Sequence, residues 1–145
     1  MMLSKILVAV DGSETSKRAF EYASFLAEKC NTSLLIVNIP DIFERVGSSS
    51  KKLQEIAKKI EKGEIGNKAM LKKFESQAKE YGIKDVYTIK QRGNVAEEIL
   101  KIADKEKVDM IVLGSRGLST AKVFLLGSVS HKVVQHAKCP VTVVR

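Results

Sequence analysis

Five short apolar runs, separated by stretches of helical periodicity, are the strongest constraint on the fold of this 145-residue chain. They are rich in Val, Ile and Leu, which is typical of strands buried on both faces. The runs cover residues 5–10, 34–39, 86–89, 110–113 and 141–144. Alternation of such strands with helices predicts an open parallel sheet with helices on both faces and right-handed crossovers. We therefore expect one α/β domain spanning residues 1–145.

Composition limits the class of protein. Apolar residues make up 44% and charged residues 29% of the chain, as in soluble globular proteins. The sequence shows neither an apolar run long enough for a membrane span nor the layout of a signal peptide. Cys30 and Cys139 are too few for a disulfide framework or a metal cluster. We expect a cytoplasmic protein with reduced thiols and no membrane partner.

The net charge of +8 raises the question of nucleic-acid binding. Residues 51–90 hold eleven lysines, but six acidic residues are interleaved with them. No motif of a nucleic-acid-binding fold accompanies the lysines. The pattern favours a solvated basic helix over 51–81, after a loop at 40–50 and with a break near Gly63 and Gly66.

Capping residues predict where several helices begin and end. Ser13 or Thr15 can cap the helix that follows the first strand. Gly82 is suited to end the basic helix, and Asn94 with Glu97 has the spacing of a capping box. The last helix is expected to run to Cys139-Pro140, with an apolar face of Val129, Val133, Val134 and Ala137.

A glycine-containing loop with the sequence GSRGLSTAKVFLLGSVS occupies residues 114–130 and joins the fourth strand to the last helix. Glycines admit close approach to an anion, and the amides at a helix N-terminus can hold phosphate. Arg116 could neutralise phosphate or be a solvated loop residue, and Ser128 and Ser130 add hydroxyls. Taken alone, these residues also fit an ordinary loop with a serine cap.

Ligands of doubly wound sheets bind outside the carboxyl ends of strands where the winding reverses. Asp11 follows the first strand and Gly114 the fourth, so both belong to one site if those strands are neighbours. Asp11 could contact a ribose hydroxyl or a phosphate-bound metal, or it could stabilise the turn into the first helix. His131, one turn into the last helix, could be a base or a surface residue.

The spacing Gly114-x2-Gly117-x9-Gly127-Ser128 resembles the G-2x-G-9x-G-S/T signature of ATP-binding members of the universal stress protein family. The flanking stretches at residues 6–13, 93–99, 108–117 and 139–144 extend the resemblance over nearly the whole chain. It implies a Rossmann-like sheet of order 3-2-1-4-5, as in adenine nucleotide alpha hydrolases. One departure is Asn38, which stands where many members carry His.

The resemblance also implies a site for ATP, ADP or AMP, with Mg on the phosphates and possible metal contact near Asp11. It places Ala9, Val10 and Asp11 at the adenine and ribose, Ile39 at the adenine, and Leu113 and Gly114 at the sugar. Its phosphate residues are Gly117, Gly127, Ser128, Val129 and Ser130. Members commonly form homodimers through the last strand, here 141–144.

The reaction class stays open at this point. The chain has no Walker A motif, nucleophile elbow or paired hydrolytic carboxylates. Only Asp11 is a candidate for holding Mg, and no group is evident that would place a nucleophile. We favour a regulatory nucleotide-binding protein in stress response. The alternatives are a slow ATPase or a partner-binding scaffold that needs no nucleotide.

Overall fold

The computed structural model describes residues 2–40, 51, 54, 55, 58, 68–116 and 127–145. Five parallel strands form one sheet in the order β3-β2-β1-β4-β5. The strands are β1 (Lys5–Ala9), β2 (Ser33–Asn38), β3 (Val86–Lys90), β4 (Met110–Gly114) and β5 (Val141–Val144). Both the strand order and the parallel pairing confirm the prediction.

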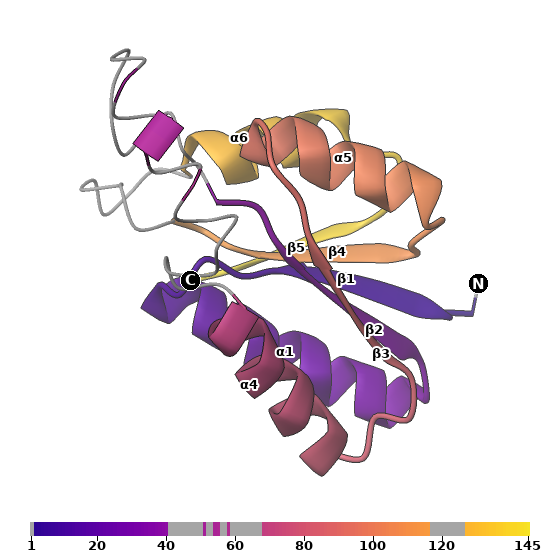
Figure 1. Cartoon of the computed structure of the whole chain (residues 1–145). Coiled ribbons are helices and arrows are strands. Elements are labelled where there is room, and N and C mark those ends of the chain that lie inside the picture. The colour runs from indigo at the N-terminus through magenta and orange to yellow at the C-terminus, as the bar shows by residue number, and fades with distance from the viewer. Residues whose placement is uncertain (1, 41–50, 52–53, 56–57, 59–67, 117–126) are drawn as a thin grey trace.

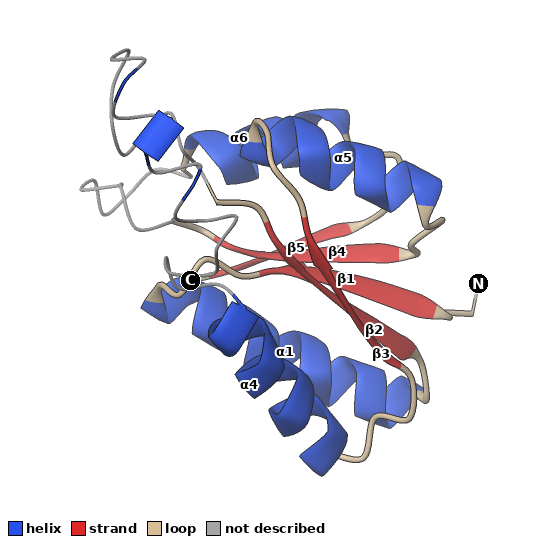
Figure 2. Ribbon diagram, in the orientation of Figure 1, coloured by secondary structure: helices blue, strands red, loops and turns tan. Residues whose placement is uncertain are grey.

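Helices cover the sheet on both faces (Figure 1). They are α1 (Glu14–Cys30), α4 (Lys68–Glu80), α5 (Val95–Lys105) and α6 (Ser128–His136). Helices α1 and α4 lie on one side, and α5 and α6 lie on the other, so the sheet forms the middle of three layers (Figure 2). None of the described helices is both long and apolar enough to cross a membrane.

Each face of the sheet has its own core. Alternate residues of the strands point to opposite faces, so Ile6 and Val8 pack toward α1 and α4, whereas Leu7 packs toward α5 and α6. The first core includes Phe20 of α1 against Phe74 of α4, with ring centroids 4.5 Å apart. Burial on both faces explains why these strands are continuous apolar runs.

Most of the predicted helix ends are observed. Ser13 caps α1 by accepting a hydrogen bond from the Ser16 amide, and Asn94 caps α5 by accepting one from the Glu97 amide. Gly82 has φ +87° just after α4, and its N–H donates to the Lys79 carbonyl. The Glu97 carboxylate pairs with Lys132 on α6, which ties the two helices together.

Some expectations differ from the structure. Helix α6 ends at His136, three residues before Cys139, and Val134 of its predicted apolar face is 47% exposed. The helix has only nine residues, and Val133 alone of that face is fully buried in the core. The loop at 41–50, most of the basic segment up to residue 67 and the break near Gly63 and Gly66 lie outside the described residues.

Candidate functional site

The turn from β1 into α1 is held by its own polar groups. The Asp11 carboxylate accepts a hydrogen bond from the Ser13 amide at 2.8 Å, and the Asp11 amide donates to the Ser16 hydroxyl at 3.3 Å. Gly12 lies between them with φ +87°, a conformation that glycine adopts without strain. Asp11 therefore stabilises the turn, one of the two roles that its position suggested.

The carboxyl ends of β1 and β4 lie next to each other. The two strands are paired, with Val8 opposite Val112. Beyond this pair, Gly114 packs against the first turn of α1, and the Thr15 hydroxyl donates to the Arg116 carbonyl. The condition for a shared site at the ends of β1 and β4 is thus met.

The N-terminus of α6 meets the same region through Ser115. The Ser115 amide donates to the Val144 carbonyl at 2.7 Å, and its carbonyl accepts from the Gly127 amide at 2.8 Å. The Ser130 hydroxyl lies 3.1 Å from both the Ser115 and the Gly127 carbonyl oxygens. These contacts hold the start of α6 beside the end of β4.

The same contacts determine which amides of α6 remain for a ligand. The Gly127 amide is already bonded to Ser115, and the first N–H with an intrahelical acceptor is that of His131, which donates to Gly127. The N–H groups of residues 128–130 have no acceptor within the helix, and no main-chain acceptor for them is found among residues 2–40, 68–116 and 127–145. A helix N-terminus with such amides carries positive potential and suits an anion.

The predicted apolar residues of the site are largely core residues. Val10, Ile39 and Leu113 are 3%, 5% and 3% exposed. Val10 faces the core beneath α1, and the other two face the core beneath α5 and α6. These three residues therefore expose little surface of either side chain or main chain, whereas Ala9 and Val129 are half-buried and keep some surface exposed.

Not every predicted residue is placed. Gly117, the middle glycine of the signature, lies outside the described residues. Arg116 is half-buried beside Gly114, and the Ser128 and His131 side chains are exposed on α6. Within the described residues, no three His, Cys, Asp or Glu side chains gather as metal ligands.

Two residues of the site were not singled out as such by the sequence pattern. Thr15 had been considered only as a helix cap, but it links α1 to the loop after β4. Ser115 joins β4, β5 and α6 through its main chain. Main-chain contacts of this kind leave no signal in side-chain periodicity. The one indication in the sequence was the position of Ser115 between Gly114 and Arg116, inside the predicted phosphate loop.

The fold and this region together define an open α/β protein with a helix N-terminus at the carboxyl edge of a doubly wound sheet. The sequence pattern of the universal stress protein family matches residues 2–145. A universal stress protein of Methanocaldococcus jannaschii is 34% identical over 144 residues, which cover 99% of this chain and 83% of the relative. The chain belongs to the universal stress protein family.

Solved structures agree with this assignment. The universal stress protein UspA from Lactobacillus plantarum superposes with a TM-score of 0.87 at 23% identity, over 100% of this chain and 99% of the other, and thus shares the fold. A universal stress protein in complex with cAMP superposes with a TM-score of 0.72 at 27% identity, over 100% of this chain and 98% of the other.

Proposed function

We propose that this universal stress protein is a regulatory protein that binds ATP or another adenine nucleotide at the carboxyl ends of β1, β2 and β4. The observation that carries the proposal is the placement of Gly114, the Asp11 turn and the start of α6 in one region. Gly114 and Gly127 are two of the three glycines of the signature. The structural relative in complex with cAMP supports an adenine-containing ligand.

In this proposal the amides of Ser128, Val129 and Ser130 hold the phosphates. Backbone donors at a helix N-terminus favour negative charge without needing a cationic side chain. Arg116 adds charge at the end of β4. Mg²⁺ commonly binds through one or two carboxylates together with substrate phosphates, and Asp11 is the carboxylate that this proposal assigns to it.

Calorimetric titration with MgATP, ADP, AMP and cAMP, with released phosphate assayed on the same samples, tests the proposal. Gly127→Val should weaken binding strongly, because its Cβ would lie 3.2 Å from the Ser115 carbonyl oxygen and the added side chain would displace the start of α6, whose amides hold the phosphates in this proposal. Arg116→Gln leaves the main-chain contacts in place and should weaken the binding of ATP more than that of adenosine. Thermal unfolding of each variant separates lost binding from lost fold.

The outcomes distinguish the candidate functions. Binding with little released phosphate supports a regulatory protein in stress response. Rapid release that is lost in Asp11→Ala would favour an ATPase. No binding by the wild type would overturn the nucleotide proposal and leave a partner-binding scaffold as the explanation.

We also propose a homodimer through β5, which is an edge strand of the sheet. The Pro140 and Val144 carbonyls accept hydrogen bonds from Ile111 and Ser115. By the alternation of a parallel ladder, the Val143 amide points away from β4. Val143→Pro should therefore yield a monomer in light scattering with the fold retained, whereas a dimeric variant would contradict this interface.

A further inference from the structure

Thr15, in the first turn of α1, makes a contact that capping of the helix does not require. The cap is Ser13, whose hydroxyl oxygen accepts a hydrogen bond from the Ser16 amide. Thr15 is 7% exposed, and its hydroxyl donates to the Arg116 carbonyl in the loop after β4. A hydroxyl has a single proton, so the proton of Thr15 is committed to that loop and not to its own helix.

The hydrogen bonds around Thr15 form a chain with one direction. The Ser13 and Thr15 hydroxyl oxygens lie 3.3 Å apart. Because Thr15 gives its proton to Arg116, Ser13 is the donor in this contact. The Ser13 amide also donates to the Asp11 carboxylate at 2.8 Å. The start of α1 therefore holds both the Asp11 turn and the Arg116 carbonyl, and hydrogen bonds linked in this way strengthen one another.

Residues 114–116 lie between the starts of two helices. The Ser115 carbonyl accepts from the Gly127 amide, at the start of α6, at 2.8 Å. The next carbonyl, that of Arg116, accepts from Thr15 of α1. Successive carbonyls are therefore held by α6 and by α1, and the Thr15 bond fixes the main chain of Arg116 where the loop of the glycine signature begins.

We propose that Thr15 is a positioning residue for the phosphate end of the site, because its hydroxyl fixes the Arg116 main chain and so places the Arg116 guanidinium for the anion. The inference rests on the proposed function, in which Arg116 adds charge at the end of β4. Threonine is β-branched and has few rotamers, so a buried Thr15 presents its hydroxyl in a fixed direction. In this role Thr15 acts through Arg116, and its loss should weaken the binding of phosphates and spare that of the base.

Limited proteolysis tests the contact without a ligand. Trypsin cleaves after Arg116, and the carbonyl that it attacks is the one that Thr15 holds. Cleavage of a locally opened segment follows the population of the open form. Thr15→Val keeps the shape of the side chain and removes the hydroxyl, so mass spectrometry should show the fragment of residues 1–116 forming about fivefold faster, the factor for one lost hydrogen bond. Thr15→Ser keeps the donor and should be cleaved at the wild-type rate. An unchanged rate in Thr15→Val would overturn the inference.

Binding supplies the second readout. In calorimetry, Thr15→Val should weaken ATP binding about fivefold and leave adenosine binding within about twofold, and Thr15→Ser should restore ATP binding. In an Arg116→Gln background, Thr15→Val should weaken ATP binding no further, because the group that Thr15 places is then absent. Full additivity of the two substitutions would contradict the positioning role.

Thr32→Val is the matched control for the loss of a buried threonine hydroxyl. Thr32 is 6% exposed, and its hydroxyl has no hydrogen-bond partner among the described residues. It precedes β2, at the opposite end of the strands from the proposed site. Thr32→Val should therefore leave both the cleavage after Arg116 and the binding of ATP unchanged.

The outcomes separate this inference from the proposed function. ATP binding by the wild type that persists unchanged in Thr15→Val overturns the inference alone. Failure of the wild type to bind either ATP or adenosine overturns the proposed function and the effect of Thr15 on a ligand, while proteolysis still shows whether Thr15 holds Arg116. An equal loss of ATP and adenosine binding in Thr15→Val would assign the effect to the packing of α1 and overturn the positioning role.

Discussion

Gly114 lies so close to Thr15 that a methyl group on its Cα would come 2.9 Å from both the carbonyl carbon and the hydroxyl oxygen of Thr15. The Ser16 amide nitrogen would be 3.0 Å away. A main chain cannot move aside as a flexible side chain can. Glycine at the end of β4 is thus required by the packing of α1, as well as by any ligand.

Gly114→Ala should lower the free energy of unfolding by about 2 kcal/mol, the usual cost of overpacking a tight contact. It should also weaken nucleotide binding, because α1 and the end of β4 must separate. Urea denaturation and calorimetry measure the two effects. Gly82→Ala is the control: it has φ +87° but no atom within 4 Å of the added Cβ. Its effect should be about 1 kcal/mol, from backbone strain alone, with binding unchanged.

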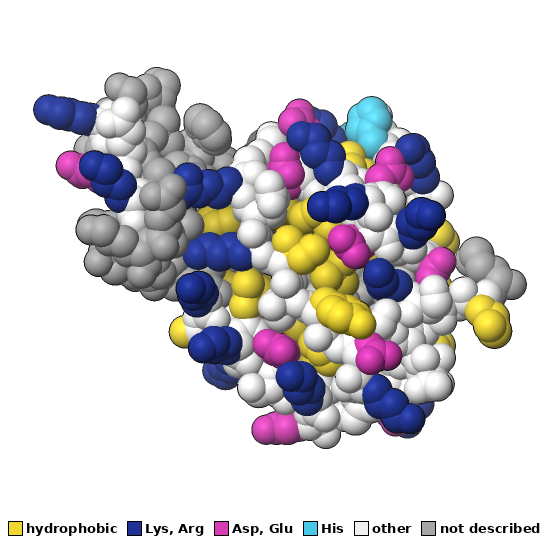
Figure 3. Space-filling view, turned by 45° about the vertical axis from the view of Figure 1, so that its right-hand side comes forward, with side chains coloured by type: hydrophobic (Ala, Val, Ile, Leu, Met, Phe, Trp, Pro, Cys, Tyr) yellow, Lys and Arg dark blue, Asp and Glu magenta, His cyan; other side chains and the backbone are white. Residues whose placement is uncertain are grey.

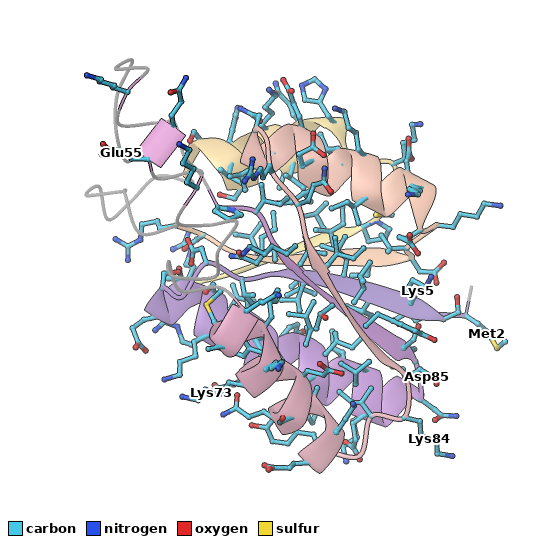
Figure 4. The ribbon with its side chains drawn as sticks, in the orientation of Figure 1. Met2, Lys5, Glu55, Lys73, Lys84 and Asp85 are labelled. Atoms are coloured by element: carbon cyan, nitrogen blue, oxygen red, sulfur yellow. The ribbon has the colours of Figure 1, made fainter. Side chains whose placement is uncertain are left out.

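Asp109 joins the amino ends of β1 and β4. These lie at the opposite end of the strands from the proposed site. Its Oδ2 accepts from the Ser4 hydroxyl at 2.6 Å, the Ser4 amide at 2.9 Å and the Lys5 amide at 3.0 Å. These hydrogen bonds, first of all that from the Ser4 hydroxyl, lower the pKa of the Asp109 carboxyl from its ordinary value. Figure 4 shows Lys5 at this edge, where β1 begins.

A lowered pKa in the folded state means that the carboxylate stabilises the fold above its unfolded pKa of about 3.9, and that this stability is lost as the pH falls through the folded pKa. Asp109→Ala should therefore lower the free energy of unfolding at pH 7 by about 1 kcal/mol, after allowance for solvent screening. The difference should shrink below about pH 4. Urea titrations at pH 7 and pH 3 measure it, with Asp104→Ala as the control carboxylate. A difference that does not change with pH would contradict the assignment.

The two thiols should differ in reactivity. Both cysteines are free, but Cys30 is exposed at the end of α1, whereas Cys139 is half-buried before β5. Burial, with a smaller contribution from the negative charge of Asp109, raises the pKa of the Cys139 thiol. Since the thiolate is the reactive form, iodoacetamide at pH 8 should alkylate Cys30 several-fold faster, as measured by peptide mass spectrometry. Equal rates in the folded protein would contradict this.

The sequence predicted the sheet well because its strands are buried on both faces, which requires continuous apolar runs such as residues 34–37. It left the choice between Ser13 and Thr15 as the cap of α1 open. The structure selects Ser13, while the Thr15 hydroxyl bonds to the Arg116 carbonyl, 101 residues away in the chain. No local pattern contains that contact.

Side-chain exposure was harder to predict than helix position. Tyr81, the last residue of the predicted basic helix, is 51% exposed, although its ring lies 6.5 Å from that of Phe20. Tyr87 of the edge strand β3 is 53% exposed. Figure 3 shows apolar side chains gathered on the face in view, with both basic and acidic side chains around them. Exposure of this kind depends on which elements are neighbours, which periodicity does not specify.

The two serines at the start of α6 should have separable roles. Ser130 is 3% exposed, and its hydroxyl lies 3.1 Å from the Ser115 and Gly127 carbonyl oxygens. Ser130→Ala should therefore lower the free energy of unfolding by about 1 kcal/mol, the net contribution of one buried hydrogen bond. Ser128 is exposed at the first position of the helix, so Ser128→Ala should leave stability within about 0.5 kcal/mol.

The affinity for ATP should depend more on the Ser128 hydroxyl than on the Ser130 hydroxyl, the reverse of their effects on stability. If the Ser128 hydroxyl reaches the phosphates, Ser128→Ala weakens ATP by about fivefold and leaves adenosine unchanged, since one hydrogen bond of about 1 kcal/mol is lost. Ser130→Ala keeps the main-chain amide of this residue. It should weaken ATP binding only if the start of α6 shifts. Calorimetry with ATP and adenosine, beside urea denaturation, measures both serines. If the Ser130→Ala protein is stable but no longer binds ATP, the buried Ser130 hydroxyl contacts the phosphate in the complex. Its contact with the Ser115 carbonyl would then belong to the ligand-free state alone.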